Sequence, residues 1–154
     1  MPPPGSTRAN AALEIMKMPE GGIVITDRRW RRCVRDVERK ITRAMRAAGC
    51  AADVVLTDDR TIRRLNYHHR GRNKPTNVLT YEHPAEILLG FGVVQREAAA
   101  AGRSVAAHLA HLLIHGALHL QGFDHHHAGD ARRMEGQEAR LLSRLRIANP
   151  WKNR

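Results

Sequence analysis

Three histidines in the second half of the chain have a spacing that suits one metal ion. His115, His119 and His125 follow the pattern H-x3-H-x5-H. Residues four apart lie on one face of a helix, so the imidazoles of His115 and His119 can converge on a single ion. Gly122 lies between the second and third histidines, and glycine tolerates the left-handed conformation that ends a helix and reverses the chain. Such a turn can bring His125 back to face the other two.

Three neutral imidazoles around one ion predict a particular kind of site. Catalytic zinc sites have three protein ligands and one open position, whereas structural zinc sites are closed by four. The surrounding apolar residues support a bound ion, because unliganded imidazoles among them would need other polar partners. These residues are Leu112, Leu113, Ile114, Leu118 and Leu120. Two alternatives stay open: a hydrogen-bonded pair of core histidines, since the chain has ten histidines, and a nickel or copper ion.

The other seven histidines are not predicted to be ligands of the ion. His111 lies one turn before His115 and is expected to be its neighbour rather than a ligand. His126 and His127 compete with His125 for the third position, and the step of six residues after the second ligand favours His125. The others are expected at the surface or around the site, and they are His68, His69, His83 and His108.

The residue after the first histidine separates this site from a class of zinc proteases with the same spacing. Those proteases have the pattern HExxHxxGxxH, in which the glutamate acts as general base. In this chain the position is Gly116. The pattern therefore argues against peptide hydrolysis.

The elements that must hold these histidines are predicted from hydrophobic periodicity and turn residues. Strands are predicted at 22–26, 52–57, 76–82 and 86–94. Helices are predicted at 28–48, 58–69, 95–102, 104–122 and 128–145. The helix at 104–122 is the most apolar, carries the first two ligands and begins with Ser104 as its expected N-cap. This order of elements predicts an α+β fold: a single mixed four-stranded sheet packed with about five helices, with the zinc site on the central apolar helix.

Two local patterns make the prediction more specific. The helix at 28–48 has one apolar face, formed by Trp30, Val34, Val37, Ile41 and Met45. Gly90 and Gly92 in the last predicted strand indicate a bulge or a close approach of another part of the chain. We expect a flexible N-terminal arm at 1–21, one catalytic domain at 22–147 and a tail at 148–154.

The composition narrows the class of partner and the compartment. The formal net charge is +11 and the sequence pI is about 11.1, which favours a polyanionic partner such as nucleic acid, although a solvated cationic surface is the alternative. Cys33 and Cys50 form no CxxC pair, as is typical of a reducing compartment. No run approaches the roughly 18 apolar residues of a membrane span, and the N-terminus lacks the pattern of a secretory signal. We therefore expect a cytoplasmic protein.

Two blocks of the sequence resemble the YbeY family, the zinc endoribonucleases of ribosomal RNA maturation. The first, HGALHLQGFDH at 115–125, is similar to that family's HGxLHLxGYDH. The second, LNYHHRGRNKPTNVLTYE at 65–82, is similar to LNxxYRGxxxPTNVLSF. The resemblance covers about 22–147, and it implies one zinc ion per chain on His115, His119 and His125 together with a functional arginine, here Arg70.

The chain departs from the family's pattern at several positions. Phe123 stands where the family usually has tyrosine, and His69 stands where it has the aromatic residue ahead of the loop arginine. Thr80 and Tyr81 replace Ser-Phe. Phe91 replaces the aspartate of the family's LGD, which leaves the ligand set intact but removes a carboxylate near the sheet.

The predicted chemistry is metal-assisted hydrolysis of a phosphodiester. Zinc lowers the pKa of a bound water towards 7 and can hold a phosphate oxygen, so His115 and His119 are expected to be catalytic as well as metal-binding. Arg70 is the candidate for meeting the charge that develops on the phosphoryl oxygens, because a guanidinium holds two oxygens at once and stays protonated. Its alternative is a solvated surface charge.

The residues around Arg70 predict how RNA would reach the site. Arg70, Arg72 and Lys74 form a cationic lip that suits RNA binding. Asn77 is expected to orient the same loop. Asp124 is expected to accept a hydrogen bond from a ligand imidazole, since zinc-bound histidines usually donate their second nitrogen.

The function implied by the resemblance is that of an endoribonuclease specific for single-stranded RNA. It would act in 16S rRNA 3′-end maturation and ribosome quality control, with the small ribosomal subunit as a partner. The alternative is a non-catalytic ribosome assembly factor that binds RNA and uses zinc only to stabilise its fold.

Overall fold

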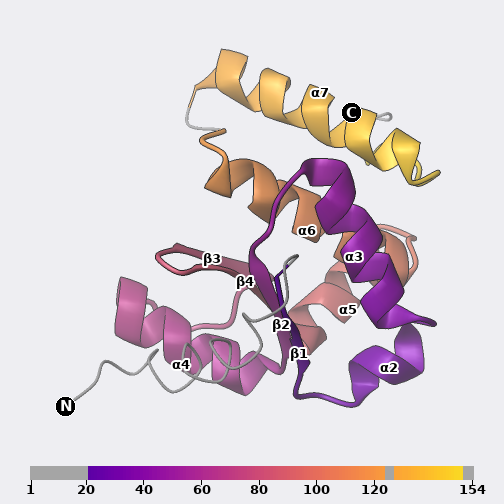
Figure 1. The fold of residues 1–154 in the computed structure, drawn as a ribbon. Coiled ribbons are helices and arrows are strands. Elements are labelled where there is room, and N and C mark those ends of the chain that lie inside the picture. The colour runs from indigo at the N-terminus through magenta and orange to yellow at the C-terminus, as the bar shows by residue number, and fades with distance from the viewer. Residues whose placement is uncertain (1–20, 124–126, 151–154) are drawn as a thin grey trace.

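The computed structural model describes residues 21–123 and 127–150, and in them four strands and six helices (Figure 1). The strands are β1 (Ile23–Ile25), β2 (Asp53–Thr57), β3 (Val78–Glu82) and β4 (Ala85–Gly90). The helices are α2 (Arg29–Cys33), α3 (Val37–Ala48), α4 (Asp59–Arg70), α5 (Phe91–Ala100), α6 (Val105–Leu120) and α7 (Ala128–Arg144). The predicted arm at 1–21, except Gly21, and the last four residues of the predicted tail lie outside the described residues.

The strands form the single mixed sheet that the sequence predicted, and their order in it is β1-β2-β4-β3. β1, β2 and β4 are parallel, and β3 pairs antiparallel with β4 at the edge of the sheet. β2 is buried along its whole length, which its sequence Asp-Val-Val-Leu-Thr allows because valine and leucine can face apolar layers on both sides. The α+β prediction is confirmed.

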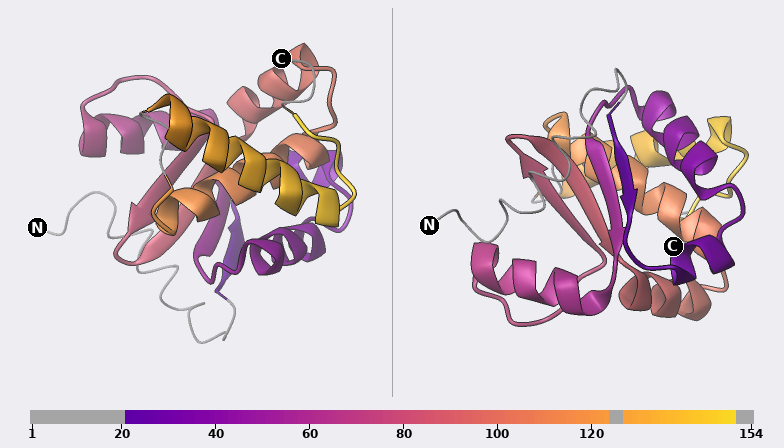
Figure 2. Two further views of the ribbon diagram at one scale, coloured as in Figure 1. Left: turned by 90° about the horizontal axis from the view of Figure 1, so that it is seen from above. Right: turned by 60° about the horizontal axis from the view of Figure 1, so that its bottom comes forward.

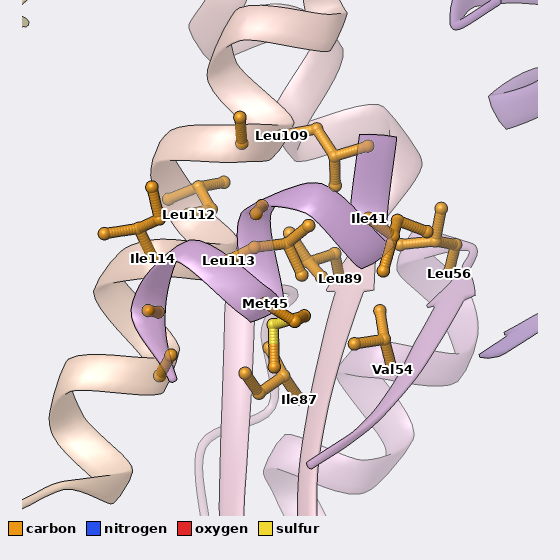
Figure 3. Close-up of a cluster of buried hydrophobic side chains, with 14 of the residues drawn as sticks. Ile41, Met45, Val54, Leu56, Ile87, Leu89, Leu109, Leu112, Leu113 and Ile114 are labelled. Carbon is orange, nitrogen blue, oxygen red and sulfur yellow. The ribbon is translucent and has the colours of Figure 1, made fainter. Parts of the chain in front are cut away.

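The helices cover the two faces of the sheet unequally (Figure 2). One face carries the larger core, in which α3, α5 and α6 cover the sheet and α7 packs on α6 and α3. The sheet contributes Val54, Leu56, Ile87 and Leu89 to this core. Figure 3 shows these four side chains meeting residues of α3 and α6. Val55 and Leu88, which alternate with them along the strands, face α4 in a smaller core on the opposite side.

Helix α6 is the central helix of the larger layer, as predicted. It contacts α3, α5 and α7 as well as strands β3 and β4. The residues from Leu109 to Ile114 are all buried, and all of them are apolar except His111. A helix enclosed in this way has its backbone held by neighbours on every side, so side chains that it carries have well-defined positions.

The first long helix of the prediction is two helices in the structure. Its apolar face is confirmed, because the five predicted residues are each at most 4% exposed. The helix is nevertheless interrupted, with Val34 extended and Asp36 at φ +51°. Before this break, Trp30 Nε1 donates a hydrogen bond to the carbonyl oxygen of Thr57 at 2.9 Å. This bond ties α2 to the end of β2, and the break allows α3 to pack along α6 instead.

The prediction of a strand at 86–94 is wrong after Gly90. The strand ends there, and α5 begins at Phe91. The helical turns predicted at 95–102 are the second part of this helix. An apolar run does not by itself distinguish a buried strand from a buried helix. The close approach predicted from Gly90 and Gly92 is present, because a Cβ atom at Gly92 would overlap the carboxylate of Asp59. That carboxylate accepts a hydrogen bond from the backbone N–H of Val93 at 3.0 Å and so caps α5.

No helix in the described part of the chain is both long enough and apolar enough to cross a lipid bilayer.

Candidate metal centre

Helix α6 presents the predicted ligands from a capped and buried position. Its first turn is fixed by Ser104, the predicted N-cap, whose Oγ accepts a hydrogen bond from the backbone N–H of Ala107 at 3.0 Å. It ends at Leu120, and Gly122 follows at φ +98°. The left-handed turn expected at this glycine is therefore present, and it redirects the chain immediately after the helix.

His115 and His119 converge as their spacing predicted. Their Nε2 atoms lie 3.1 Å apart, and their ring centroids are separated by 4.6 Å. Two nitrogen ligands at about 2.0–2.1 Å from a tetrahedral zinc ion lie about 3.3 Å from each other. The separation therefore fits a shared ion and equally fits a direct hydrogen bond between the two rings, the alternative stated in the sequence analysis. The side chain of His115 is 25% exposed, so this position can be reached from solvent.

Glu138 of α7 holds the second nitrogen of His115. Its Oε1 accepts a hydrogen bond from His115 Nδ1 at 3.0 Å and another from His111 Nε2 at 2.9 Å. Glu138 is fully buried. Burial raises the pKa of this carboxyl group, but the hydrogen bonds and charges of the two histidines outweigh burial and lower the pKa to about 2. Glu138 is therefore an ionised carboxylate that orients imidazoles.

The carboxylate determines which nitrogen of His115 is free for a metal. An ionised carboxylate only accepts hydrogen bonds, so both facing nitrogens must carry hydrogen. With its hydrogen on Nδ1, neutral His115 has its lone pair on Nε2, the atom that faces His119. Zinc-bound histidines typically have such a carboxylate on their second nitrogen.

His111 is a neighbour of the site rather than a ligand, as expected from its spacing. Its Nε2 donates to Glu138, and its Nδ1 lies 3.4 Å from the NH1 of Arg103, which can only donate. Both nitrogens are therefore used. Burial lowers the pKa of Arg103, whose guanidinium reaches this site from the turn between α5 and α6.

The third predicted ligand, His125, and the predicted hydrogen-bond acceptor Asp124 lie outside the described residues. Within residues 21–123 and 127–150, no three His, Cys, Asp or Glu side chains are gathered so that they could hold a metal ion. The described structure therefore supplies a pair of converging imidazoles, and the third ligand stays a prediction. One buried acceptor, Glu138 Oε2, has no hydrogen-bond partner among the described residues.

Glu138 was missed by the sequence analysis, although the sequence holds a signal for it. The buried residues of α7 are Met134, Glu138, Leu141 and Leu142. Their spacing of four, three and one is that of an apolar stripe on a helix. A glutamate within such a stripe must be buried, and buried carboxylates need donors. The stripe thus marks Glu138, but it does not identify the partner helix.

Asn77 lies close to His115, in a network of hydrogen bonds with Glu97 of α5 and His108 of α6. Its Oδ1 accepts a hydrogen bond from the backbone N–H of Val78 at 2.7 Å, and its Nδ2 donates to Glu97 Oε1 at 3.0 Å. Glu97 also accepts from His108 Nε2 at 2.9 Å. Asn77 and His115 line the same cavity. The interaction with Val78 fits the predicted role of Asn77 in orienting the loop before β3.

Arg70 and the metal-site histidines lie on opposite sides of the edge strand. Arg70 is the last residue of α4, which packs on the face of the sheet away from α6. Next to it, His69 packs against the ring of Tyr81 at a centroid distance of 5.1 Å. On the other face, a Cβ atom at Gly116 would lie 3.2 Å from the side chain of Thr80. β3, at the edge of the sheet, therefore lies between α4 and α6.

The loop after Arg70 is held against α4, and its cations are exposed. Arg63 Nε donates to Asn73 Oδ1 at 2.8 Å, and Asn66 Nδ2 donates to the carbonyl oxygen of Lys74 at 2.9 Å. Arg72 and Lys74 are exposed. The predicted cationic lip is thus a surface feature anchored through its backbone and through Asn73.

Comparison with known proteins settles the family. A family model described as Endoribonuclease YbeY matches residues 18–146. The chain belongs to the YbeY family. The resemblance seen in the two sequence blocks is therefore confirmed.

Relatives in the YbeY family match most of the chain. An Endoribonuclease YbeY of Gluconobacter oxydans is 49% identical over 145 residues, which cover 84% of this chain and 86% of the relative. One of Rhodopseudomonas palustris is 35% identical over 161 residues, which cover 87% and 82%. The solution structure of a Thermotoga maritima protein has a TM-score of 0.53 at 20% identity and covers 81% of this chain and 91% of that one. At this identity the structural similarity shows the fold alone.

Phe91, the departure from the YbeY family's LGD, has a structural role here. It is 1% exposed, packs edge-on against Trp30 at a centroid distance of 5.2 Å, and lies under the guanidinium of Arg29 at 4.6 Å. The beginning of α5 still has a carboxylate, because Asp59 of α4 supplies one to Val93. The replacement therefore exchanges a carboxylate for an aromatic contact at a helix end that is capped from elsewhere.

Proposed function

We propose that the protein is a zinc-dependent endoribonuclease that cuts single-stranded RNA by attack of water on a phosphodiester. His115, His119 and His125 would hold the ion. The observation that supports this proposal most strongly is the 3.1 Å separation of the Nε2 atoms of His115 and His119, with the former imidazole oriented by Glu138. The relatives named Endoribonuclease YbeY support the same reaction class.

The residues of this chain would divide the chemistry among them. Zinc, when bound, supplies Lewis-acid chemistry that makes hydroxide available near neutral pH and polarises a phosphoryl oxygen. Glu138 keeps the lone pair of His115 on Nε2 and stabilises positive charge on the ring. Arg70 would contact phosphoryl oxygens from across β3, on an RNA strand that passes over this edge of the sheet.

The proposed biological substrate is ribosomal RNA. The net charge of +11 favours a polyanion, and exposed Arg72 and Lys74 lie in the loop beside Arg70. We place the cleavage in 16S rRNA 3′-end maturation and ribosome quality control, in the cytoplasm, with the small ribosomal subunit as partner.

One experiment tests the reaction and separates it from a purely structural use of zinc. The purified full-length protein is analysed for its metal content and then incubated with a single-stranded RNA, the same RNA in a duplex, and the single-stranded RNA with a chelator. We expect about one zinc per chain and internal cuts in the single strand only, abolished by the chelator and restored by zinc. RNA that is bound but stays intact with zinc present would instead indicate the non-catalytic assembly factor.

A further inference from the structure

A small cavity lies next to His115, between α5, α6 and the beginning of β3. Its volume is about 270 Å³. It is lined by Asn77, Val78, Glu97, His108, Leu112 and the imidazoles of His111 and His115. This is slightly below the range of about 300–1,000 Å³ for small-molecule pockets, so it fits one compact group rather than a length of chain.

Glu97 is the acidic residue of this cavity, and its acceptor capacity is only partly used. Oε1 accepts hydrogen bonds from His108 Nε2 at 2.9 Å and from Asn77 Nδ2 at 3.0 Å. Among residues 21–123 and 127–150, Oε2 has only a long contact of 3.4 Å, with the same Asn77 nitrogen. The side chain of Glu97 is 41% exposed. A carboxylate oxygen accepts up to two hydrogen bonds, so Oε2 can accept another from a ligand.

The two side chains that donate hydrogen bonds to Glu97, Asn77 and His108, do so as neutral groups. Burial lowers the pKa of His108 more than its hydrogen bond to Glu97 raises it, so this imidazole is neutral near pH 7 and only donates a hydrogen bond. A carboxylate repels the phosphates of RNA but accepts hydrogen bonds from neutral donors, which on a nucleotide are the ribose hydroxyls and the N–H groups of the base. Val78 and Leu112 supply apolar surface for a sugar or base ring.

We propose that this cavity binds the nucleoside next to the scissile phosphate, with Glu97 accepting a hydrogen bond from its ribose 2′-hydroxyl or from a base N–H. The inference rests on the proposed function, because His115 lines the same cavity and therefore places the bound nucleoside beside the reacting phosphate. Asn77 and His108 are positioning residues that orient the carboxylate.

The test uses short RNAs that differ at one position. In one series a single 2′-deoxynucleotide is moved along the strand, and in a second series a single base is exchanged for one with fewer N–H donors. Binding constants in the presence of a chelator, by fluorescence anisotropy, and kcat and KM with zinc are measured for each RNA. For the wild-type protein we expect one position at which one of these changes weakens binding about tenfold or more, as for a hydrogen bond to a charged group.

Glu97→Gln should remove that sensitivity, while Glu82→Gln, the same change at the exposed end of β3, should keep it. Loss of the 2′-deoxy sensitivity assigns the ribose, and loss of the base sensitivity assigns the base. The proposal is overturned if the wild-type protein shows no sensitive position, or if Glu97→Gln retains the full effect. Absence of RNA cleavage would contradict the proposed function. The effect of Glu97→Gln on binding could still be interpreted, because binding is measured without turnover.

Discussion

At the scale of single residues, the site depends on which nitrogen of an imidazole is free. Glu138 lies within hydrogen-bond distance of His111 and His115 and is removed from water, so it restricts both rings more strongly than an exposed carboxylate could. The same atoms explain why His111 can share the helix face without competing for the ion.

Replacing a ligand and replacing the loop arginine should have different effects. His115→Ala should abolish both bound zinc and RNA cleavage, because one of the two converging nitrogens is lost. Arg70→Ala should retain zinc and lower cleavage by about 100-fold, which is the usual effect of removing one donor to a developing anion. Elemental analysis and initial rates on one RNA measure both effects. Full zinc occupancy in His115→Ala would reject it as a ligand, and unchanged turnover in Arg70→Ala would remove Arg70 from the mechanism.

Glu138→Gln tests the orienting carboxylate without changing its size. Glutamine offers one acceptor and one donor group, so it cannot accept from His111 and His115 in the same way as the carboxylate. We expect zinc affinity to fall by about 10–100-fold, as for other replacements of groups that support a metal ligand. Competition with a chromophoric chelator measures the affinity. Glu135→Gln, one turn earlier on α7, serves as the control, and equal affinities for the two variants would disprove the role of Glu138.

At the scale of elements, several contacts that hold the fold together join residues far apart in the sequence. Asp59 at the beginning of α4 caps α5, and Trp30 of α2 donates a hydrogen bond to the end of β2. Glu138 of α7 accepts a hydrogen bond from His115 of α6. Gly92 and Gly116 lie where neighbouring elements approach closely. A side chain at the position after His115 would have to fit against Ile87 and Thr80 of the sheet, where glycine leaves room for the close approach.

Two glycine substitutions should have opposite effects on stability. Gly92→Ala places a methyl group against the carboxylate of Asp59, so we expect it to lower the free energy of unfolding by about 1–2 kcal/mol through overpacking and a weakened cap. Gly136→Ala in α7 meets no atom within 4 Å of its Cβ and should raise stability by up to about 1 kcal/mol through helix propensity. Urea unfolding measures both. Equal stability of Gly92→Ala and wild type would show that Asp59 moves aside at no cost.

The features that were predicted from the sequence depend on residues close together in the chain. The features that were missed depend on contacts between distant segments. The convergence of His115 and His119 follows from helix periodicity, and the turn at Gly122 follows from the conformational freedom of glycine. The break between α2 and α3 was not predicted, because the apolar spacing continues through it and the hydrogen bond of Trp30 to a distant strand is a tertiary contact. The end of β4 could not be predicted because the apolar run continues into α5. Glu138 could be recognised as buried, but not as the partner of histidines 23 and 27 residues away.

At the scale of the whole molecule, charge and shape determine how a nucleic acid would approach. The net charge is +11, and the arginines of α2 and α3 add to the cationic loop after α4. The metal-site histidines and that loop lie on either side of the edge strand β3, so a strand of RNA that contacts both must cross this edge.

RNA affinity should fall steeply with salt, because each phosphate contact releases bound cations. Arg72→Ala should reduce the slope of log K against log[salt] by about 0.7, the contribution of one phosphate contact on a single strand. Arg39→Ala on α3 should do the same only if the arginines of that helix also touch RNA. Anisotropy titrations between 50 and 200 mM salt, roughly the range in which such effects are large, measure the slopes. A wild-type affinity independent of salt would contradict the electrostatic part of the interface.

The hydrogen bonds between Glu138 of α7 and the histidines of α6 also predict what truncation of the chain would do. A polypeptide ending shortly after HGALHLQGFDH would contain every predicted ligand and the whole signature, yet it would lack Glu138 and the helix that covers this face. Such a fragment would still match the family's sequence motif, but without Glu138 the imidazole of His115 could adopt either tautomer. Premature stop codons between the signature and codon 138 should therefore inactivate this protein as surely as the loss of a histidine.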